Sequence, residues 1–315
     1  MKSNNENNIQ GKSALSISLK GIKKTYNKGT VTAVKNISFS VNKGELFGLI
    51  GPDGAGKTTL FRILTTLLLA DEGTATVNGF DVVKDYKAIR NCVGYMPGKF
   101  SLYQDLTIEE NLNFFATVFG TTIKQNYDLI KDIYIQIEPF KDRRAGKLSG
   151  GMKQKLALCC ALIHKPDVLF LDEPTTGVDA VSRKEFWEML KRLKEQGITI
   201  LVSTPYMDEA NLCDRIALIQ RGEILSIDTP AKIIESFPQQ LYAIHSSKTF
   251  KLLQDTRSFS GTDSCFAFGD ALHATFKNGT EKDVIGYLQS KGNEDVQMKI
   301  ITPTIEDCFI NLLKN

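Results

Sequence analysis

The stretch "GPDGAGKTT" at residues 51–59 constrains the fold of this chain more than any other feature of its sequence. It follows the short apolar run "ELFGLI" (45–50), and the segment after it is predicted to be a helix beginning at Lys57. Apolar residues at helical spacing would give that helix one buried face: Leu60, Ile63, Leu64 and Leu67. A glycine turn between a strand and a helix points backbone N–H groups at an anion. We therefore expect a phosphate-binding loop in an α/β fold rather than a chance glycine turn.

Each position of this loop has an expected role in nucleotide binding. The backbone of the loop and of the first helical turn would cradle the phosphates: Gly51, Pro52, Asp53, Gly54, Ala55, Gly56, Lys57, Thr58 and Thr59. Lys57 would reach the β and γ phosphate oxygens, and the Thr58 hydroxyl would ligate Mg²⁺. The expected ligands are a nucleoside triphosphate and Mg²⁺.

A second motif, "DVLFLDEP" at residues 167–174, reads as a buried strand that ends in two acids. In an open α/β sheet, ligands bind at the carboxyl ends of the strands. Asp172 would therefore hold Mg²⁺, and Glu173 would polarise the attacking water. The alternative is a pair of solvated acids in a loop.

Strands and helices alternate along the first three quarters of the chain, which predicts a largely parallel sheet covered by helices. Residues 14–41 read as two strands and residues 107–138 as helical, with Thr107 and Glu110 forming a capping box. After Pro238 the order changes to βαββαβ, which is typical of a small α+β ferredoxin-like unit. We predict a disordered lead-in at 1–13, an ATP-binding domain at 14–237 and an accessory domain at 238–315.

Composition excludes several classes of function. The net charge is +3 and no dense Lys/Arg block occurs, so nucleic acid is not an expected partner. The six cysteines form no CxxC pair and are expected to be reduced thiols. The longest apolar runs, such as "LTTLLLA" (64–70), are far shorter than the roughly 20 residues that span a bilayer. If the chain serves transport, another polypeptide must supply the channel.

A third motif, "LSGGMKQKL" at residues 148–156, is a second anion-binding turn at a helix start. Because the chain already holds one complete cradle, this turn suggests a γ-phosphate presented by another subunit. The order of Tyr26, the phosphate loop, this turn, the acidic strand and "TTGVDA" (175–180) resembles ATP-binding-cassette (ABC) transporter ATPases. The resemblance covers roughly residues 15–235 and implies a mixed sheet with a β-subdomain and a helical subdomain.

The resemblance also implies roles for residues outside the phosphate loop. Tyr26 would stack on adenine, although it could be merely a surface aromatic side chain. Ser149, Gly150 and Gly151 would contact the γ-phosphate bound on the opposite subunit, and Asp179 would cross the dimer interface. Two ATP molecules would lie head-to-tail between two such domains, and their hydrolysis would drive a membrane partner.

Two positions depart from the family pattern. Gly98 stands where the family usually has a Gln that meets Mg²⁺ and water, and Pro205 stands where a His usually contacts the γ-phosphate. Losing one preorganised donor typically costs a factor of about 10²–10³ in rate. We therefore weigh an asymmetric pair with another ABC domain, in which this chain's own site is slow, against a homodimer that tolerates both changes.

Further segments resemble ABC-2-type exporter subunits of the drug-resistance and YbhF-like group, notably "FSLYQDLTIEENLNFFATVFG" (100–120) and "TPTIEDCFINLL" (302–313). The resemblance implies an ABC-2-type membrane permease docking near residues 98–120. It also implies a cytoplasmic chain bound peripherally to the inner face of the cell membrane. The alternative function is a non-transport ABC ATPase or an ATP-binding regulator with negligible turnover.

Overall fold

The computed structural model describes residues 15–314, so the predicted lead-in at 1–13 lies outside the described residues. By its internal contacts the chain divides into two compact units between Thr229 and Pro230. This division lies earlier in the chain than the boundary expected after residue 237. Helix α7 (Pro230–Glu235) therefore groups with the second unit, where the Ile233 carbonyl accepts a weak bond from the Cys308 thiol at 3.5 Å.

The first unit contains an antiparallel sheet with the strand order β2-β1-β4-β5. Its strands are β1 (Leu15–Tyr26), β2 (Val31–Asn42), β4 (Glu72–Val77) and β5 (Phe80–Asp81). Apolar and polar residues alternate along β1, so Ile17 and Leu19 are buried on one face. This sheet is the β-subdomain that the sequence resemblance implies.

A second sheet carries the phosphate loop and has the strand order β10-β9-β3-β8-β7-β6. Its strands are β3 (Leu46–Ile50), β6 (Val93–Met96), β7 (Val168–Asp172), β8 (Thr199–Thr204), β9 (Arg215–Gln220) and β10 (Glu223–Asp228). All neighbours pair in parallel except β10, which is antiparallel to β9. The predicted mixed sheet is confirmed.

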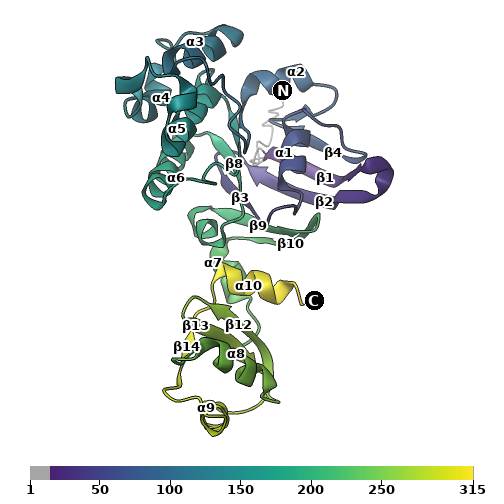
Figure 1. The fold of residues 1–315 in the computed structure, drawn as a ribbon. Coiled ribbons are helices and arrows are strands. Elements are labelled where there is room, and N and C mark those ends of the chain that lie inside the picture. Colours follow the sequence, from purple (N-terminus) through teal and green to yellow (C-terminus); the bar gives the residue numbers. More distant parts are fainter. Residues whose placement is uncertain (1–14, 315) are drawn as a thin grey trace, which may run out of the picture. The chain divides into compact units, whose positions relative to one another are not determined.

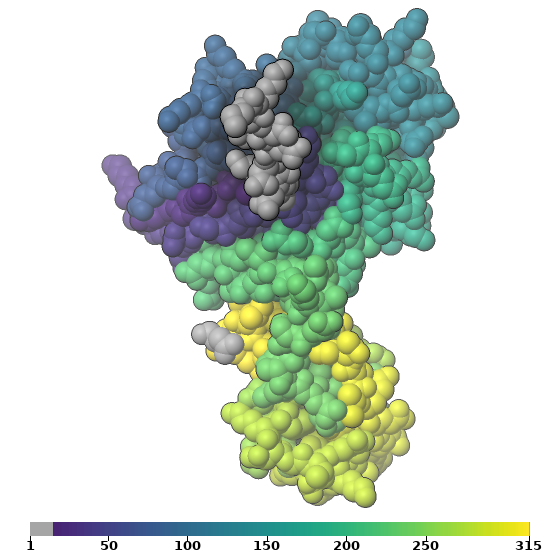
Figure 2. Space-filling view, turned by 180° about the vertical axis from the view of Figure 1, so that it is seen from behind, coloured from purple at the N-terminus to yellow at the C-terminus, as the bar shows by residue number. Residues whose placement is uncertain are grey.

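Helices complete the first unit. The α-helices are α1 (Lys57–Leu64), α2 (Tyr86–Cys92), α3 (Ile108–Val118), α4 (Tyr127–Tyr134), α5 (Gly150–Leu162) and α6 (Ala180–Glu195). Short 3₁₀ turns are η1 (Asn27–Gly29), η2 (Glu138–Phe140), η3 (Ala145–Lys147) and η4 (Met207–Leu212). Helices α3, α4 and α5 gather in one helical lobe, away from β1, β2 and β4 (Figure 1). In the space-filling view from behind, residues from about 100 to 160, coloured blue to teal, form one continuous lobe beside the purple N-terminal part of the first unit (Figure 2).

Two local expectations were wrong. The helical region predicted for 107–138 is interrupted after α3, because Gly120 takes the left-handed conformation with φ 66° and the chain resumes as α4 only at Tyr127. Leu67 lies beyond the end of α1 and is 58% exposed, because Thr66 leaves the helix with φ 63°. The predicted capping box of Thr107 and Glu110 is confirmed.

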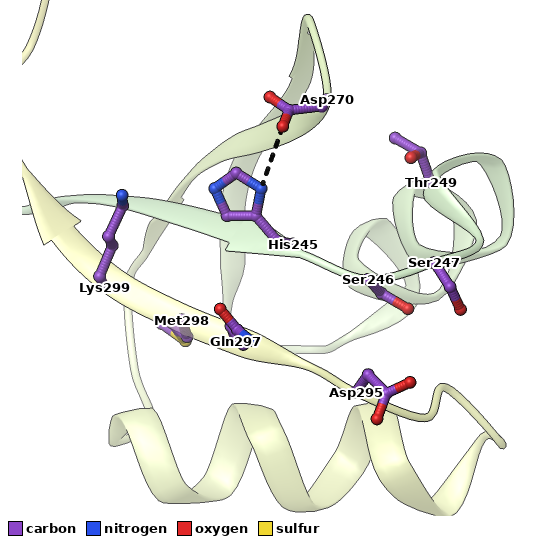
Figure 3. A pocket seen from close by; sticks show the side chains of 9 residues that line it. All are labelled: His245, Ser246, Ser247, Thr249, Asp270, Asp295, Gln297, Met298 and Lys299. Carbon is purple, nitrogen blue, oxygen red and sulfur yellow. Dashed lines mark ion pairs between the residues drawn. The ribbon is translucent and has the colours of Figure 1, made fainter.

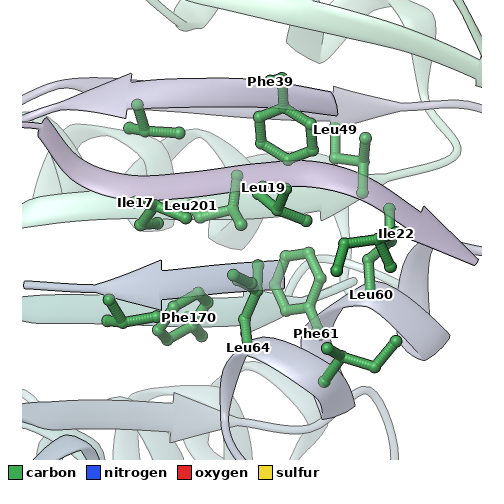
Figure 4. Packing of buried hydrophobic residues seen from close by; sticks show 14 of the residues in the cluster. Ile17, Leu19, Ile22, Phe39, Leu49, Leu60, Phe61, Leu64, Phe170 and Leu201 are labelled. Atoms are coloured by element: carbon green, nitrogen blue, oxygen red, sulfur yellow. The ribbon is translucent and has the colours of Figure 1, made fainter. Parts of the chain in front are cut away.

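One apolar core joins the two sheets through α1 (Figure 4). Phe61 of α1 meets Phe170 of β7 edge to face, with ring centroids 6.0 Å apart. Both rings are fully buried, and burying a phenylalanine contributes about 1.5–3 kcal/mol. The helix of the phosphate loop is thereby fixed against the strand of the acidic pair.

The second unit is a four-stranded antiparallel sheet with the order β12-β13-β11-β14. Its elements after α7 are β11 (Leu241–His245), α8 (Thr249–Ser258), β12 (Thr262–Phe268), β13 (Ala271–Phe276), α9 (Glu281–Ser290), β14 (Gln297–Ile301) and α10 (Ile305–Leu312). Ile244, Leu272 and Leu288 form the centre of its core. The predicted βαββαβ order is confirmed.

Candidate functional site

The candidate site lies at the carboxyl edge of the parallel strands. Ile50, the last residue of β3, pairs with Thr204 at the end of β8, and Asp172 of β7 pairs with Ser203. The loops that follow these three neighbouring strands therefore start at the same level of the sheet. This register brings together segments that are more than 100 residues apart in sequence.

The nine predicted loop residues, 51–59, join β3 to the first turn of α1. Gly54 and Gly56 have φ of 77° and 108°, a conformation that glycine adopts without strain. A Cβ at Gly51 would lie 2.1 Å from the Ile219 carbonyl oxygen, so only glycine fits there. The Gly51 N–H donates to the Thr204 carbonyl at 3.2 Å, which ties the loop to β8.

Lys57 is folded back into the loop. Its ammonium group donates to the carbonyl oxygens of Gly51 at 2.7 Å and Pro52 at 3.0 Å, and it lies 3.1 Å from Glu173 Oε1. The Lys57 side chain is 2% exposed and the Glu173 side chain 23%. A phosphate entering the loop competes with these three oxygens for the ammonium group.

The acidic pair is oriented by β8. The Ser203 hydroxyl donates to Asp172 Oδ1 at 2.7 Å and accepts the Glu173 N–H at 3.0 Å. The same N–H also donates to the Ser203 carbonyl at 3.1 Å. These bonds hold Glu173 in the left-handed region with φ 52°, a strained conformation for a carboxylate residue. Burial, with the Asp172 charge, raises the pKa of the nearby Tyr95 phenol to about 12.

The residues present fit a magnesium-bound nucleoside triphosphate. The loop supplies a glycine-lined turn at a helix N-terminus and a buried ammonium group, and Asp172 and the Thr58 hydroxyl would supply hard oxygen ligands. Among residues 15–314 no group of three or more His, Cys, Asp or Glu side chains could hold a metal ion. A Mg²⁺ ion here would therefore take part of its coordination from phosphate oxygens and water.

The two departures from the family pattern also lie at this edge. A Cβ at Gly98 would stand 3.0 Å from the Asp172 carbonyl oxygen and 3.8 Å from Glu173 Cβ. Pro205 directly follows Thr204, whose carbonyl accepts the Gly51 N–H. Proline offers neither a side-chain donor nor an N–H, and glycine offers no side chain. Neither position can supply a side-chain donor to a phosphate or a water.

Tyr26 ends β1, and its hydroxyl lies 3.3 Å from the Thr59 hydroxyl at the start of α1. The ring is therefore beside the phosphate loop, where the sequence interpretation puts the adenine. Its stacking role stays a prediction.

The "LSGG" turn and Asp179 form a second group of predicted residues. Ser149 caps α5 by accepting the Met152 N–H at 3.4 Å, and a Cβ at Gly151 would lie 2.9 Å from the Ser182 hydroxyl oxygen. Asp179 caps α6 by accepting the N–H groups of Val181 and Ser182, and the bond from Ser182 lowers the pKa of the Asp179 carboxyl. The two helix starts therefore lie side by side.

A groove of about 480 Å³ opens between the sheet that carries the phosphate loop and the helical lobe. Its lining is largely apolar and includes Met96, Leu102, Phe115, Val118 and Phe119. His164 also lines it and stacks on Phe119 with ring centroids 3.8 Å apart. Because the carbonyl of Val93 can only accept, the bond of 3.0 Å to His164 Nε2 places a proton on that nitrogen. Burial lowers the pKa of His164.

The second unit has a different, polar pocket of about 620 Å³ between β11, β14 and the β12–β13 turn (Figure 3). His245 points toward Asp270, with 3.9 Å between Nδ1 and Oδ2, and Lys299 extends from β14. None of the residues predicted to bind nucleotide lies in it. The phosphate-loop edge is therefore the candidate site.

Sequence reasoning missed two residues that the fold brings to this site. Ser203 orients both acids, and Glu209, only 2% exposed, accepts hydrogen bonds from Thr175 and Thr204. Ser203 could have been found from the sequence, because it is a hydroxyl residue at the carboxyl end of a predicted strand, directly before Thr204 and Pro205. No local pattern marks Glu209, because two of its partners, Thr175 and Arg183, are 34 and 26 residues away in sequence.

Comparisons with known proteins agree with this geometry. The family model described as "ABC transporter" matches residues 34–176. The chain is 40% identical over 302 residues to the "Probable multidrug ABC transporter ATP-binding protein YbhF" of Escherichia coli (strain K12). That match covers 94% of the chain and 52% of the relative, so the chain spans about half the length of this relative.

Two further relatives are named for export or resistance. The "Nod factor export ATP-binding protein I" of Rhizobium sp. (strain N33) is 34% identical over 304 residues, which are 95% of the chain and 97% of the relative. The "Doxorubicin resistance ATP-binding protein DrrA" of Mycobacterium tuberculosis (strain CDC 1551 / Oshkosh) is 38% identical, over 68% of the chain and 66% of the relative. These names do not favour the alternative of a non-transport ATPase.

A solved structure with the same fold is a dimeric ATP-binding cassette in a post-hydrolysis state, bound to ADP and phosphate. It is 26% identical with a TM-score of 0.61, and the match covers 68% of this chain and 98% of the cassette. On this evidence the chain belongs to the family of ABC transporter ATP-binding proteins.

Proposed function

We propose that the chain is the ATP-binding and ATP-hydrolysing subunit of an ABC-2-type exporter. The observation that carries the proposal is the meeting of the phosphate loop, the acidic pair and the segment 203–205 at one sheet edge. The names of the relatives, which concern a multidrug ABC transporter, Nod factor export and doxorubicin resistance, support the exporter class.

In this proposal the loop binds the triphosphate and Lys57 exchanges its carbonyl and Glu173 partners for phosphate oxygens. Glu173, freed from Lys57, accepts a proton from the attacking water. Thr58 and Asp172 would hold a Mg²⁺ ion, which would neutralise part of the phosphate charge. Ser203 keeps both carboxylates in place throughout.

We further propose that two ATP-binding domains pair head-to-tail. Ser149, Gly150, Gly151 and Asp179 of this chain would complete the site on the partner domain, and Tyr26 would hold the adenine of its own site. Because Gly98 and Pro205 supply no donors, the site on this chain's own phosphate loop would be the slow one of the pair. The partner's site, completed by the intact "LSGG" turn, would be the fast one.

The apolar groove beside the helical lobe would receive a segment of an ABC-2-type permease at the cytoplasmic face of the cell membrane. Within the described part of the chain, no helix combines the length and the apolar character needed to cross a bilayer. Val118 lines the groove and is 62% exposed, so a partner segment would cover it.

Phosphate release tests the ATPase part of the proposal. We expect the purified chain to bind ATP and to hydrolyse it slowly, with the residual turnover lost in Glu173→Gln. Turnover at the rate of an ordinary cassette dimer would refute the slow site. Failure to bind ATP would refute the whole proposal.

A photo-crosslinking amino acid at position 118 tests the docking part. In cells that express the chain, we expect adducts with an integral membrane protein, identified by mass spectrometry. The matched control is position 135 on the same lobe, where Ile135 is 53% exposed outside the groove lining. Adducts confined to soluble proteins, or equal adducts from both positions, would contradict docking at the groove.

A further inference from the structure

Glu209 is a buried carboxylate next to the segment that carries Pro205. Its side chain is 2% exposed. Oε2 accepts hydrogen bonds from the hydroxyls of Thr175, at 3.1 Å, and Thr204, and Oε1 accepts from Arg183 Nε at 3.1 Å. Burying a charge is unfavourable unless such partners compensate it.

The three donors come from three different elements. Thr204 ends β8, Thr175 lies in the loop that follows Glu173, and Arg183 belongs to the first turns of α6. The Arg183 N–H also donates to the carbonyl of Asp179, the residue that caps α6. One carboxylate therefore connects the segment after β8 to the loop that leads from Glu173 to Asp179.

The segment around Pro205 has a second tie to α6. The Arg183 guanidinium lies 4.4 Å from the centre of the Tyr206 ring and 3.1 Å from Asp208 Oδ2. The Thr204 hydroxyl, which donates to Glu209, accepts the Tyr206 N–H at 3.1 Å. Side chains thus fix the backbone on both sides of the proline, which lacks an N–H of its own.

We propose that Glu209 is a positioning residue: its hydrogen bonds hold the segment 204–209 and the loop 174–179 together as one rigid unit. It does not touch the nucleotide. It fixes where the Glu173 carboxylate and the Asp179 helix cap stand relative to the phosphate loop. The inference rests on the proposed ATPase function for its kinetic readout and on geometry alone for its second readout.

The test compares Glu209→Gln, in η4, with a matched control, Glu185→Gln, in α6. Glutamine keeps the shape, but its NH₂ group cannot accept from a hydroxyl or a guanidinium. The control is Glu185→Gln, which removes the ion pair of 2.8 Å between Lys155 and Glu185. Thr175→Val is a milder second variant, because it deletes one bond to Glu209 without changing the side-chain shape.

The kinetic readout separates positioning from simple destabilisation. We expect Glu209→Gln to lower kcat about tenfold or more while KM for ATP stays within about twofold. Thr175→Val should change kcat in the same direction, and Glu185→Gln should change neither constant. Unchanged kcat and KM in both Glu209→Gln and Thr175→Val, with only the melting temperature lowered, would overturn the proposal.

Amide hydrogen exchange supplies a readout that needs no turnover. In the chain without nucleotide, Glu209→Gln should speed exchange in 174–179 by about tenfold, although that loop is distant in sequence. Faster exchange confined to 204–212 would show a local role and overturn the coupling. If the wild-type chain shows no turnover, the proposed ATPase function fails, and the exchange result still decides the role of Glu209.

Discussion

Replacing Glu173 by glutamine should change ATP binding and ATP turnover in opposite directions. The Glu173 carboxylate lies 3.1 Å from the Lys57 ammonium group, which must reach the phosphates. In the proposed mechanism this carboxylate also places a negative charge beside the γ-phosphate. Glu173→Gln removes the carboxylate charge that competes with the phosphates for Lys57 and repels them. The same change removes the group proposed to accept the proton of the attacking water.

The sizes of both effects follow from the geometry. The Lys57 side chain is 2% exposed and the Glu173 side chain 23%, and we take about 1 kcal/mol for the pair, the upper end of the range for solvent-exposed ion pairs. Releasing Lys57 should therefore tighten ATP binding about fivefold. Removing the proton acceptor should lower turnover by about 10²–10⁴.

The assay pairs an equilibrium titration with a fluorescent ATP analogue and a phosphate-release measurement on the same preparation. The matched control is Glu185→Gln. Glu185 lies in α6 and pairs with Lys155, so its replacement should change neither the affinity for ATP nor the turnover. Weaker ATP binding in Glu173→Gln would refute the competition for Lys57. Turnover equal to that of the wild type would refute the role of Glu173 as proton acceptor.

Three further predictions concern single positions. Pro205→His adds a donor beside the phosphate loop and should raise the turnover of the purified chain by up to about 10²-fold in a phosphate-release assay; an unchanged rate would remove Pro205 as the cause of a slow site. Gly51→Ala should lower the free energy of unfolding in urea by about 1–3 kcal/mol or more, because its Cβ would lie 2.1 Å from the Ile219 carbonyl. At Gly54 an added Cβ would meet open space, but the backbone has a φ of 77°, so Gly54→Ala should lower the free energy of unfolding by only about 1–2 kcal/mol. A larger loss of stability for Gly54→Ala than for Gly51→Ala would contradict this steric reasoning. Burial lowers the pKa of His164 from its ordinary 6.5, so the unfolded chain binds that proton first and stability should fall as pH drops below about 6.5. His164→Gln should lose less stability than the wild type between pH 7 and pH 5.5 in urea titrations, and parallel curves would exclude His164 as the source.

Several features of this protein are determined by local sequence. The phosphate loop is readable because a strand, a glycine turn and a helix follow one another within about 20 residues, which is a local requirement. Strand β7 can be predicted because it is a continuous apolar run that ends in an acid, and the capping box at Thr107 because its partners are three residues apart. The βαββαβ order of the second unit can also be predicted, because each of its helices and strands shows its own local pattern of apolar residues.

Other features depend on tertiary structure, because they join residues that only the sheet register brings together. The Ser203 hydroxyl between Asp172 and Glu173 depends on the parallel pairing of β7 with β8, which no local pattern specifies. The sequence thus identified the groups that we propose to bind and hydrolyse a nucleotide. Only the packed sheet decided which buried polar groups hold them in place, because a buried charge is tolerated only where distant donors converge on it.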